Sequence, residues 1–333
     1  MKKKWFIGID ISKKTLDVVI YDACKKRSDV TNYRKVSNSE EGYRELLSWF
    51  KSKRMPLSSV VVGMEHTGAY GFDLRLFLEN HGIDYCAFMP LALKYSLGLS
   101  RGKNDKVDAE RIAAYTYSRR EQLVYAKLAG SSILKLRELS NERKLLVRQR
   151  AEHEAVLTEM KGRESNGTYT RCLRIKDMLD REIDDIEQEM DALVKSSPEL
   201  ANNYRLLTGI KGIGSVNAIA TIVYTDNFKG FETARQYACY LGIAPFEHTS
   251  GTSVRGRTHV SRIGAKQLKA DLSQAAKSAI VWDQEIKAYY KRKIKEGKAF
   301  GVVLNAVKFK LVCRMFAVVR RGTPFVELMT YKN

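Results

Sequence analysis

A predicted buried strand occupies residues 4–10, Lys-Trp-Phe-Ile-Gly-Ile-Asp, and ends in a carboxylate. The next residues, Ser-Lys-Lys at 12–14, favour a turn, and the alternating apolar residues of 15–21 predict a second strand. Further on, Val-Val-Val at 60–62 is the β-branched run of a strand that is buried on both faces, and it leads to Glu65. The sequence therefore predicts a sheet that begins with a hairpin.

The remaining elements of this region alternate around the sheet. A third strand is expected near 30–36, and Asn38 or Ser39 is expected to cap a helix whose apolar residues fall at helical spacing. A helix over roughly 70–80 and a strand over 83–89 follow. The order hairpin, strand, helix, strand, helix, strand is typical of a mixed α/β sheet.

The segment from about 132 to 195 has a different pattern. Apolar residues recur at helical spacing on both sides of the polar stretch Gly-Arg-Glu-Ser-Asn-Gly at 162–167. This pattern predicts two long helices joined by a turn, which form an antiparallel coiled-coil arm. Arg143 and Arg150 fall on the seam, so we expect the arm to need a partner, either a second copy of the chain or nucleic acid.

The length of 333 residues is enough for about two domains, each with its own core. We divide the chain into an α/β domain at 1–128, the coiled-coil arm at 129–197, and a basic domain punctuated by glycine at 198–333. The last of these is expected to be mostly α-helical. No internal repeat or low-complexity tract is evident.

The charge of the chain indicates a polyanionic partner. Its 58 Lys and Arg against 38 Asp and Glu give a formal net charge of +20, and so many like charges repel one another in a compact state. An acidic membrane surface is the competing partner, but no apolar run approaches about 18 residues and no basic amphipathic anchor is present. We therefore expect a nucleic-acid partner and no membrane.

The five cysteines are scattered and form no Cys-x-x-Cys pair. Their spacing argues against a zinc knuckle and against a disulfide framework, and it fits a reducing compartment. Met-Lys-Lys-Lys at 1–4 resembles the start of a signal peptide, but Asp10 and Lys13 interrupt the apolar stretch that would have to follow. We expect a cytoplasmic protein, associated with the bacterial nucleoid.

Four carboxylates form a candidate metal site: Asp10, Glu65, Asp105 and Asp108. Asp10 and Glu65 end two strands that we expect to lie side by side. Asp105 and Asp108 are spaced i, i+3 at a helix start, so they share one helix face. Hard oxygen ligands suit Mg²⁺ or Mn²⁺, and a pair of such ions can clamp the attacking and leaving oxygens of a phosphoryl transfer.

These acids also have structural interpretations. Asp105 could be an N-cap, Asp108 could pair with the helix dipole, and Asp10 could be a turn residue. Glu65 is favoured as a ligand because a charge directly after Val-Val-Val-Gly-Met is costly unless it is paired or coordinating. The two other acids of the hairpin region are assigned to solvated positions: Asp17 and Asp22.

A helix-hairpin-helix element is resembled by the segment 207–218, which reads Leu-Thr-Gly-Ile-Lys-Gly-Ile-Gly-Ser-Val-Asn-Ala. In such an element the Gly-Ile-Gly turn exposes backbone N–H groups to a phosphate, and Lys211 is a candidate contact. The alternative is a tight turn between two packed helices. The segment is not a P-loop, because no Gly-Lys-Ser/Thr follows.

A basic cluster follows the segment 242–253, which reads Gly-Ile-Ala-Pro-Phe-Glu-His-Thr-Ser-Gly-Thr-Ser. Its members are candidate nucleic-acid contacts: Arg255, Arg257, Arg262, Lys266 and Lys269. Arginines suit attack on a phosphate because they offset charge in the transition state. On this ground alone Ser250 has no special status over neighbouring hydroxyls, and the default is a phosphate-binding loop. The basic segment 287–321 is either a helix along a phosphate backbone or a solvated face over an apolar core.

Taken in order, several motifs resemble those of the IS110 insertion-sequence family, the DEDD transposases that also include the Piv DNA invertases. The motifs are Gly-Ile-Asp-Ile-Ser-Lys at 8–13, Met-Glu-His-Thr-Gly-Ala-Tyr-Gly at 64–71, Lys-Asn-Asp-Lys-Val-Asp-Ala at 103–109, Gly-Ile-Lys-Gly-Ile-Gly at 209–214, Gly-Ile-Ala-Pro-Phe-Glu-His-Thr-Ser-Gly at 242–251 and Ser-Arg-Ile-Gly at 261–264. The resemblance covers nearly the whole chain. Two departures are mild: Thr252, where many relatives have a second glycine, and Lys269, where an arginine is usual.

The resemblance implies a RuvC-like, RNase H-type domain in which Asp10, Glu65, Asp105 and Asp108 bind metal. It also implies a C-terminal transposase domain in which Ser250 attacks a DNA strand and forms a covalent phosphoserine link. The two halves of one site are implied to come from different subunits of a dimer or tetramer, bridged by the coiled coil. A noncoding bridge RNA is implied to guide the protein to target and donor DNA.

Three hypotheses about function follow from these features. The first is an RNA-guided DNA recombinase that uses the serine and the carboxylates, either as a transposase of an insertion sequence or as a Piv-like site-specific invertase. The second is a metal-dependent junction-resolving nuclease in which water is the nucleophile. The third is a nucleic-acid-binding protein without catalytic activity.

Overall fold

The computed structural model describes residues 3–21, 32–65, 68–90, 92–93, 104–250, 254–261 and 264–326, with the backbone alone at 68–69, 247–250 and 254–259. The chain divides into two compact units, Met1–Leu128 (unit 1) and Ala129–Asn333 (unit 2). Each unit is described by itself below.

Unit 1 is built on a mixed five-stranded sheet, in the order β3-β2-β1-β4-β5. The first three strands form an antiparallel meander, and β4 and β5 run parallel to β1. The strands are β1 (Trp5–Ile11), β2 (Thr15–Tyr21), β3 (Tyr33–Ser37), β4 (Val60–Glu65) and β5 (Asp84–Phe88). The predicted strands and the α/β class of this unit are therefore confirmed.

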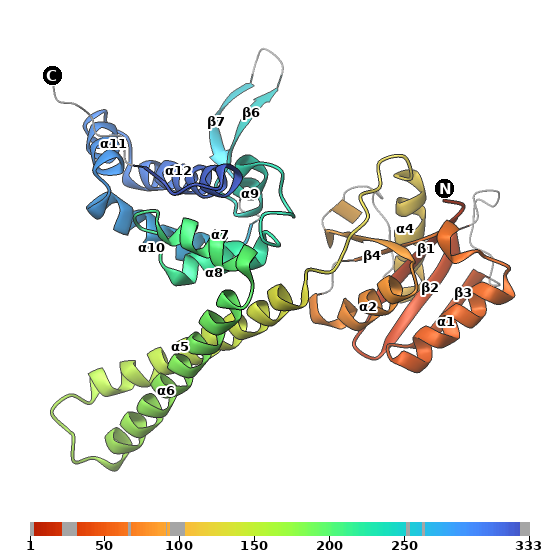
Figure 1. Ribbon diagram of the computed structural model, residues 1–333, viewed down its shortest axis with the longest axis horizontal. Coiled ribbons are helices and arrows are strands. Elements are labelled where there is room, and N and C mark those ends of the chain that lie inside the picture. Colours follow the sequence, from red (N-terminus) through yellow and green to blue (C-terminus); the bar gives the residue numbers. More distant parts are fainter. Residues whose placement is uncertain are drawn as a thin grey trace. The chain divides into compact units, whose positions relative to one another are not determined.

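Helices cover both faces of this sheet (Figure 1). The helix α1 (Glu40–Ser52) follows Ser39 in the N-cap position, and α2 (Phe72–Asn80) follows the short 3₁₀ turn η3 (Gly68–Gly71). Both pack on one face, where the main core of unit 1 lies. A second short turn, η2 (Leu57–Ser59), leads into β4. The helix α4 (Asp105–Ser118) packs on the other face, against β1, β2 and β4.

The close approach of α4 to the sheet depends on Gly8 in the middle of β1. A Cβ atom at this position would overlap the Ala109 carbonyl oxygen and the Ala113 amide nitrogen of α4. Both alanines are fully buried, so small residues on the two elements allow the backbones to touch. This contact fixes the first turn of α4 near the carboxyl end of β1.

We predict that Gly8→Ala lowers the free energy of unfolding of unit 1 by about 2–3 kcal/mol, because backbone atoms of α4 must move to make room. Gly301→Ala is the matched control, since no atom lies within 4 Å of the added Cβ. In this helical position alanine is expected to be neutral or stabilising by up to about 1 kcal/mol. Urea unfolding of both variants checks the prediction, and equal midpoints would refute the tight packing of α4 on β1.

Unit 2 is mainly helical, as the sequence predicts for the C-terminal region. Its elements are α5 (Ser131–Glu159), α6 (Gly167–Lys195), α7 (Pro198–Thr208), α8 (Ser215–Tyr224), α9 (Ala234–Tyr240), β6 (Pro245–Ser250), β7 (Val254–Val260), α10 (Lys266–Trp282), α11 (Gln284–Lys295) and α12 (Phe300–Arg321). One apolar core joins the base of α5 and α6 to the later helices. Leu136 and Leu139 of α5 and Val194 of α6 are among its most buried members.

The helices α5 and α6 form a long antiparallel pair (Figure 1). The arginines predicted on its seam are paired inside the hairpin: Arg143 Nε donates to Glu187 Oε1 at 2.6 Å, and Arg150 NH1 donates to Asp180 Oδ1 at 3.2 Å. These two positions therefore have partners in the same chain, and the need of the arm for a further partner stays a prediction. A coiled-coil geometry for the pair stays a prediction.

The helix α12 runs through the core of unit 2, which favours the second interpretation of the basic segment 287–321. Its buried face includes Val307, Leu311 and Met315, and it also buries the cation of Arg314. Arg314 NH1 lies 2.6 Å from Asp283 Oδ2, and the Asp283 carboxylate in turn caps α11 by accepting from the Ile286 amide at 2.8 Å. This buried ion pair joins the start of α11 to the middle of α12.

Candidate active site

Acidic side chains form a row across the sheet of unit 1, on the face that α4 covers. Asp10 lies two residues after Gly8 and therefore on the same face of β1. The register pairs Asp10 with Asp17 of β2, and Asp17 with Lys35 of β3. On the other side, Glu65 follows Met64, the parallel partner of Ile9, so it lies beside Asp10. Two of the predicted carboxylates are thus neighbours on adjacent strands.

The first turn of α4 carries the other two predicted carboxylates, Asp105 and Asp108. The cap of this helix is Asn104, whose side chain accepts from the Lys106 amide at 3.1 Å. The N-cap interpretation of Asp105 is therefore wrong, and its carboxylate is free of the capping role. Asp108, three residues later in the same turn, pairs with Arg111 Nη1 at 2.8 Å.

The five acids are close enough to influence one another electrostatically. Together, burial and then the charges of Asp105, Asp108, Asp17 and Glu65, in that order of size, raise the pKa of the Asp10 carboxyl to about 6. Asp10 is half-buried, so water does not fully screen this repulsion. The site therefore concentrates negative charge on an otherwise strongly basic chain.

Asp17 corrects the sequence interpretation, which placed it in solvent. It is 2% exposed, accepts a hydrogen bond from the Tyr33 hydroxyl at 2.6 Å, and pairs with Lys35 Nζ at 3.1 Å. The reason is that β2 lies between β1 and β3 under α4, so both faces of the strand are covered. The sequence feature that could have indicated its burial is that Asp17 is the one carboxylate inside the apolar run of 16–20. Asp22 lies outside the described residues.

Lys35 is a second residue that sequence reasoning missed. Its ammonium pairs with Asp17, and it also lies 4.0 Å from Asp105 Oδ2. Lys35 therefore reaches from the acidic row of the sheet to the acidic turn of α4. It supplies one positive charge next to a group of carboxylates that repel one another.

The chemistry of this donor set fits a hard divalent cation such as Mg²⁺ or Mn²⁺. The pKa of Asp10 is raised by burial and also by the charges of the neighbouring acids, and a bound cation would offset those charges. Across the part of the chain that the structure describes, no three His, Cys, Asp or Glu side chains are gathered as a ready metal site. The carboxylates would therefore have to draw together around an ion.

We predict that Lys35→Met tightens Mn²⁺ binding by about threefold to fivefold, because a half-exposed cation that competes for Asp105 is removed. The same change is expected to lower the melting temperature of the metal-free protein, since the repulsion between carboxylates loses its local counter-charge. Titration calorimetry and thermal melts with and without Mn²⁺ measure the two effects. The control is Lys53→Met, an exposed residue directly after α1 on the opposite face of the sheet. Unchanged affinity in the Lys35 variant would contradict the assigned role.

Ser250 is the last residue of β6, where the structure forms a β-hairpin in place of the expected loop. The register pairs Ser250 with Val254 and Thr249 with Arg255, and a bulge lies between Phe246 and His248. The hairpin extends from the helices of unit 2, with Ser250 at its outer end (Figure 1). Arg257 also lies on β7, whereas Arg262 lies outside the described residues.

The base of the hairpin is held by side chains from two helices. Lys269 Nζ of α10 donates to the Gly242 carbonyl at 2.7 Å, and Asn305 Nδ2 of α12 donates to the Ile243 carbonyl at 2.8 Å. Lys269 was predicted as a nucleic-acid contact, and in the structure its ammonium supports the strand that leads to Ser250. Lys266, in the first turn of α10, is exposed.

The predicted helix-hairpin-helix segment consists of α7, a tight turn and α8. Gly212 in this turn has a φ of +93°, which favours glycine, and an added Cβ would lie 2.6 Å from the Ala275 carbonyl of α10. The turn is therefore a packed structural element, as the alternative interpretation proposed. Lys211 is exposed beside it, and the N-cap residue of α8, Gly214, has no side chain to cap the helix; a role in phosphate binding stays a prediction.

Comparison with known families finds two matches along the chain. Residues 7–160 match the DEDD transposase domain of the IS110 family, described as a transposase, and residues 204–291 match the transposase domain of the IS116/IS110/IS902 family. The first match contains the four predicted carboxylates, and the second contains Ser250 and the basic cluster. The chain belongs to the IS110 family of transposases and recombinases.

Curated relatives extend over the full chain. The pilin gene-inverting protein of Moraxella lacunata is 29% identical over 332 residues, covering 97% of this chain and 98% of the relative, and that of Moraxella bovis matches equally. A protein of the insertion element IS110 from Streptomyces coelicolor is 30% identical over 144 residues, which cover 43% of this chain and 34% of the relative. Within the described residues, no helix has the length and apolarity needed to cross a membrane.

Proposed function

We propose that this chain is a metal-dependent DNA recombinase that cuts and exchanges strands through a serine nucleophile. The observation that supports it most is that Glu65, Asp105 and Asp108, from two other segments of sequence, lie near enough to Asp10 for their charges to raise its pKa. The strand order β3-β2-β1-β4-β5, an antiparallel meander followed by parallel strands, supports a RuvC-like, RNase H-type domain.

In this proposal the four carboxylates hold Mg²⁺ or Mn²⁺, which polarises the phosphate and stabilises charge on the oxygens that exchange. Asp17 and Lys35 position the neighbouring carboxylates and do not bind metal. Both Asp17 oxygens already have partners, one in the Tyr33 hydroxyl and one in the Lys35 ammonium. The negative charge of Asp105 and Asp108 is itself stabilised at the N-terminus of α4.

Ser250 is the proposed nucleophile. Its Oγ forms a bond to phosphorus while the bond from phosphorus to one deoxyribose oxygen breaks, so the serine loses its proton and the released sugar oxygen gains one. Arg255, Arg257 and Arg262 offset the charge of the transition state, and Lys211, Lys266 and Lys269 form part of the nucleic-acid-binding surface. The strand is rejoined when a sugar hydroxyl attacks the phosphoserine in the reverse sense.

The DNA partners and their arrangement also belong to the proposal. Ser250 lies in unit 2 and the carboxylates in unit 1, and we propose that one site combines these parts from different copies of a dimer or tetramer. A noncoding RNA is proposed as the guide to target and donor DNA, which suits the net charge of +20. The name of the Moraxella relatives supports inversion of a DNA segment as the outcome, and the insertion-element relative supports transposition.

A junction-resolving nuclease is the second candidate. It is favoured by one observation, that the carboxylates form a cluster within unit 1 alone, which would suffice for attack by water. The experiment that separates the two compares wild type, Ser250→Ala, Asp105→Ala and the control Ser253→Ala on labelled DNA with Mg²⁺ and co-purified RNA. Strand cleavage and protein–DNA adducts are resolved on denaturing gels.

The recombinase predicts an adduct in wild type and in Ser253→Ala, and neither adduct nor exchange in the other two variants. Cleavage by Ser250→Ala, with no adduct in any protein, would support the nuclease. A wild-type protein that binds DNA and RNA without any cleavage would support a binding protein.

A further inference from the structure

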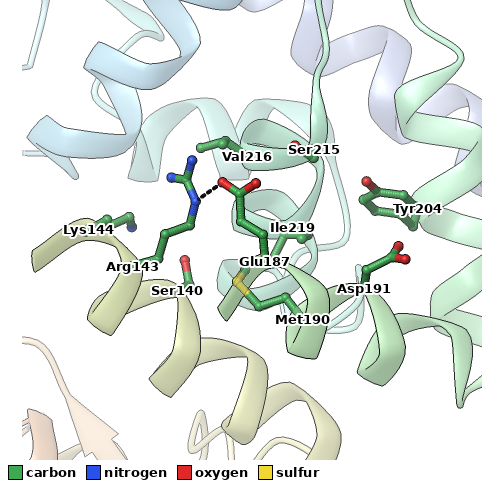
Figure 2. Close-up of a pocket in the computed structure, with 10 residues that line it drawn as sticks. All are labelled: Ser140, Arg143, Lys144, Glu187, Met190, Asp191, Tyr204, Ser215, Val216 and Ile219. Atoms are coloured by element: carbon green, nitrogen blue, oxygen red, sulfur yellow. Dashed lines mark hydrogen bonds and ion pairs between the residues drawn. The ribbon is translucent and has the colours of Figure 1, made fainter. Parts of the chain in front are cut away.

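A cavity of about 200 Å³ lies in unit 2 where α5, α6, α7 and α8 meet (Figure 2). One wall is apolar and includes Met190 and Ile219, which are at most 6% exposed. The other walls carry hydroxyl, guanidinium, carboxylate and phenol groups. A mixed lining of this kind suits a small ligand that has one flat apolar part and several polar atoms.

The α8 side of the cavity favours an anion. The first turn of α8 begins at Ser215 after Gly214, an N-cap residue without a side chain to cap the helix, and Ser215 and Val216 line the cavity. Arg143 from α5 approaches the same turn in Figure 2. Its Nε donates to Glu187, and within the described residues the other guanidinium nitrogens have no recorded partner. A helix start beside an arginine matches the needs of a phosphate.

A second feature independently indicates a polar ligand. Ser140 of α5 is 8% exposed, and its hydroxyl has no hydrogen-bond partner in the described part of the chain. In Figure 2 this hydroxyl points into the cavity. A hydroxyl in this position can form a hydrogen bond with an occupant of the cavity.

The carboxylates in the lining do not prevent an anion from binding. Glu187 is paired with Arg143 at 2.6 Å, and Asp191 is paired with Lys195 at 2.5 Å. Their remaining lone pairs can accept hydrogen bonds from amino or hydroxyl groups. Tyr204 adds an aromatic ring to the lining. Unpaired bases are recognised by such combinations of stacking and polar contacts.

We propose that this cavity binds one unpaired nucleotide of a nucleic-acid strand, with its phosphate at the first turn of α8 and its base against Met190 and Ile219. The inference rests on the proposed function only in assuming a nucleic-acid partner. It gives the segment 207–218 a defined role, because the start of α8 forms one wall of a site that α5 and α6 complete. The strand is DNA or RNA, since both supply the same nucleotide chemistry.

The test uses Val216→Glu in the full-length chain. An acid in the first turn of a helix favours folding, so the variant is expected to remain stable while it repels the phosphate. The control is Val302→Glu, the same change at an exposed position in the first turn of α12. Binding is measured by fluorescence anisotropy at one salt concentration, with labelled single-stranded DNA, single-stranded RNA and duplex DNA of equal length.

We expect Val216→Glu to weaken binding of at least one type of single strand by about tenfold relative to duplex, and Val302→Glu to change it less than about twofold. The affected strand identifies whether the nucleotide comes from DNA or RNA. Ser140→Ala, which removes the hydroxyl and adds no atom to the cavity, is expected to act in the same direction. Unchanged single-strand binding, or equal loss on single strand and duplex, would overturn the proposal.

This result is separable from the proposed catalytic function. A wild-type protein that fails to cut DNA but still shows the selective effect of Val216→Glu would refute the recombinase and leave the nucleotide site intact.

Discussion

Asp10→Asn is expected to reduce DNA strand cleavage by at least about 100-fold, because the central member of the proposed ligand set loses its charge. The amide has the shape of the carboxylate, so β1 and its contact with α4 should be preserved. Cleavage is measured under single-turnover conditions with Mg²⁺. The matched control is Asp73→Asn, an exposed acid on α2 at the opposite face of the sheet. Activity of the Asp10 variant within a few-fold of wild type would contradict its role.

The same substitution is expected to stabilise the metal-free protein at neutral pH. The folded-state pKa of Asp10 is about 6 and its ordinary value is 3.8, so the folded protein binds the proton more tightly than the unfolded chain. The charge of Asp10 therefore lowers the free energy of unfolding. This loss is fully present above pH 6 and disappears as pH falls below about 3.8. After allowance for partial exposure, we expect a gain on the order of 1 kcal/mol at pH 7.5, and none at pH 3.5.

Asp283→Ala is expected to cause the largest loss of stability, about 3–5 kcal/mol, because it leaves the buried charge of Arg314 without its closest partner. Both side chains are at most 10% exposed, and the same carboxylate caps α11. The control is Glu285→Ala, which also removes a partner of Arg314, at 2.7 Å, but one that is 60% exposed. Its cost should stay below about 1 kcal/mol. Urea unfolding of both variants gives the comparison, and similar costs would contradict the role assigned to burial.

Much of unit 1 could be predicted because its strands carry their own signals. The β-branched run at 60–62 and the short turn at 12–14 fixed two strands and a hairpin, and the order of elements indicated the α/β class. The i, i+3 spacing of Asp105 and Asp108 correctly placed both on the first turn of a helix. Local patterns suffice for these features, since each depends on residues that are close in sequence.

The errors concern contacts between distant segments. From the sequence, Asp17 was assigned to a solvated hairpin position, but β3 and α4 cover β2 in the fold. Lys35 lies beside Asp17 because β3 pairs with β2. In the sequence, Arg143 and Arg150 interrupt the apolar seam of the helix pair. In the structure, α6 supplies their partners, Glu187 and Asp180. Lys269 stays a predicted nucleic-acid contact, but its hydrogen bond to the Gly242 carbonyl could not be predicted from the sequence. In each case the partner lies more than about ten residues away, beyond the reach of periodicity.

Mapping the amino acid that carries DNA tests the central claim most directly. The adduct formed by wild type with Mg²⁺ would be digested with nuclease and protease, and the modified peptide sequenced by mass spectrometry. The account predicts a nucleotide phosphate on Ser250 in wild type and no modified peptide from Asp10→Asn. A nucleotide on Thr249, Ser253 or Ser261, or cleaved DNA without any attached protein, would contradict it.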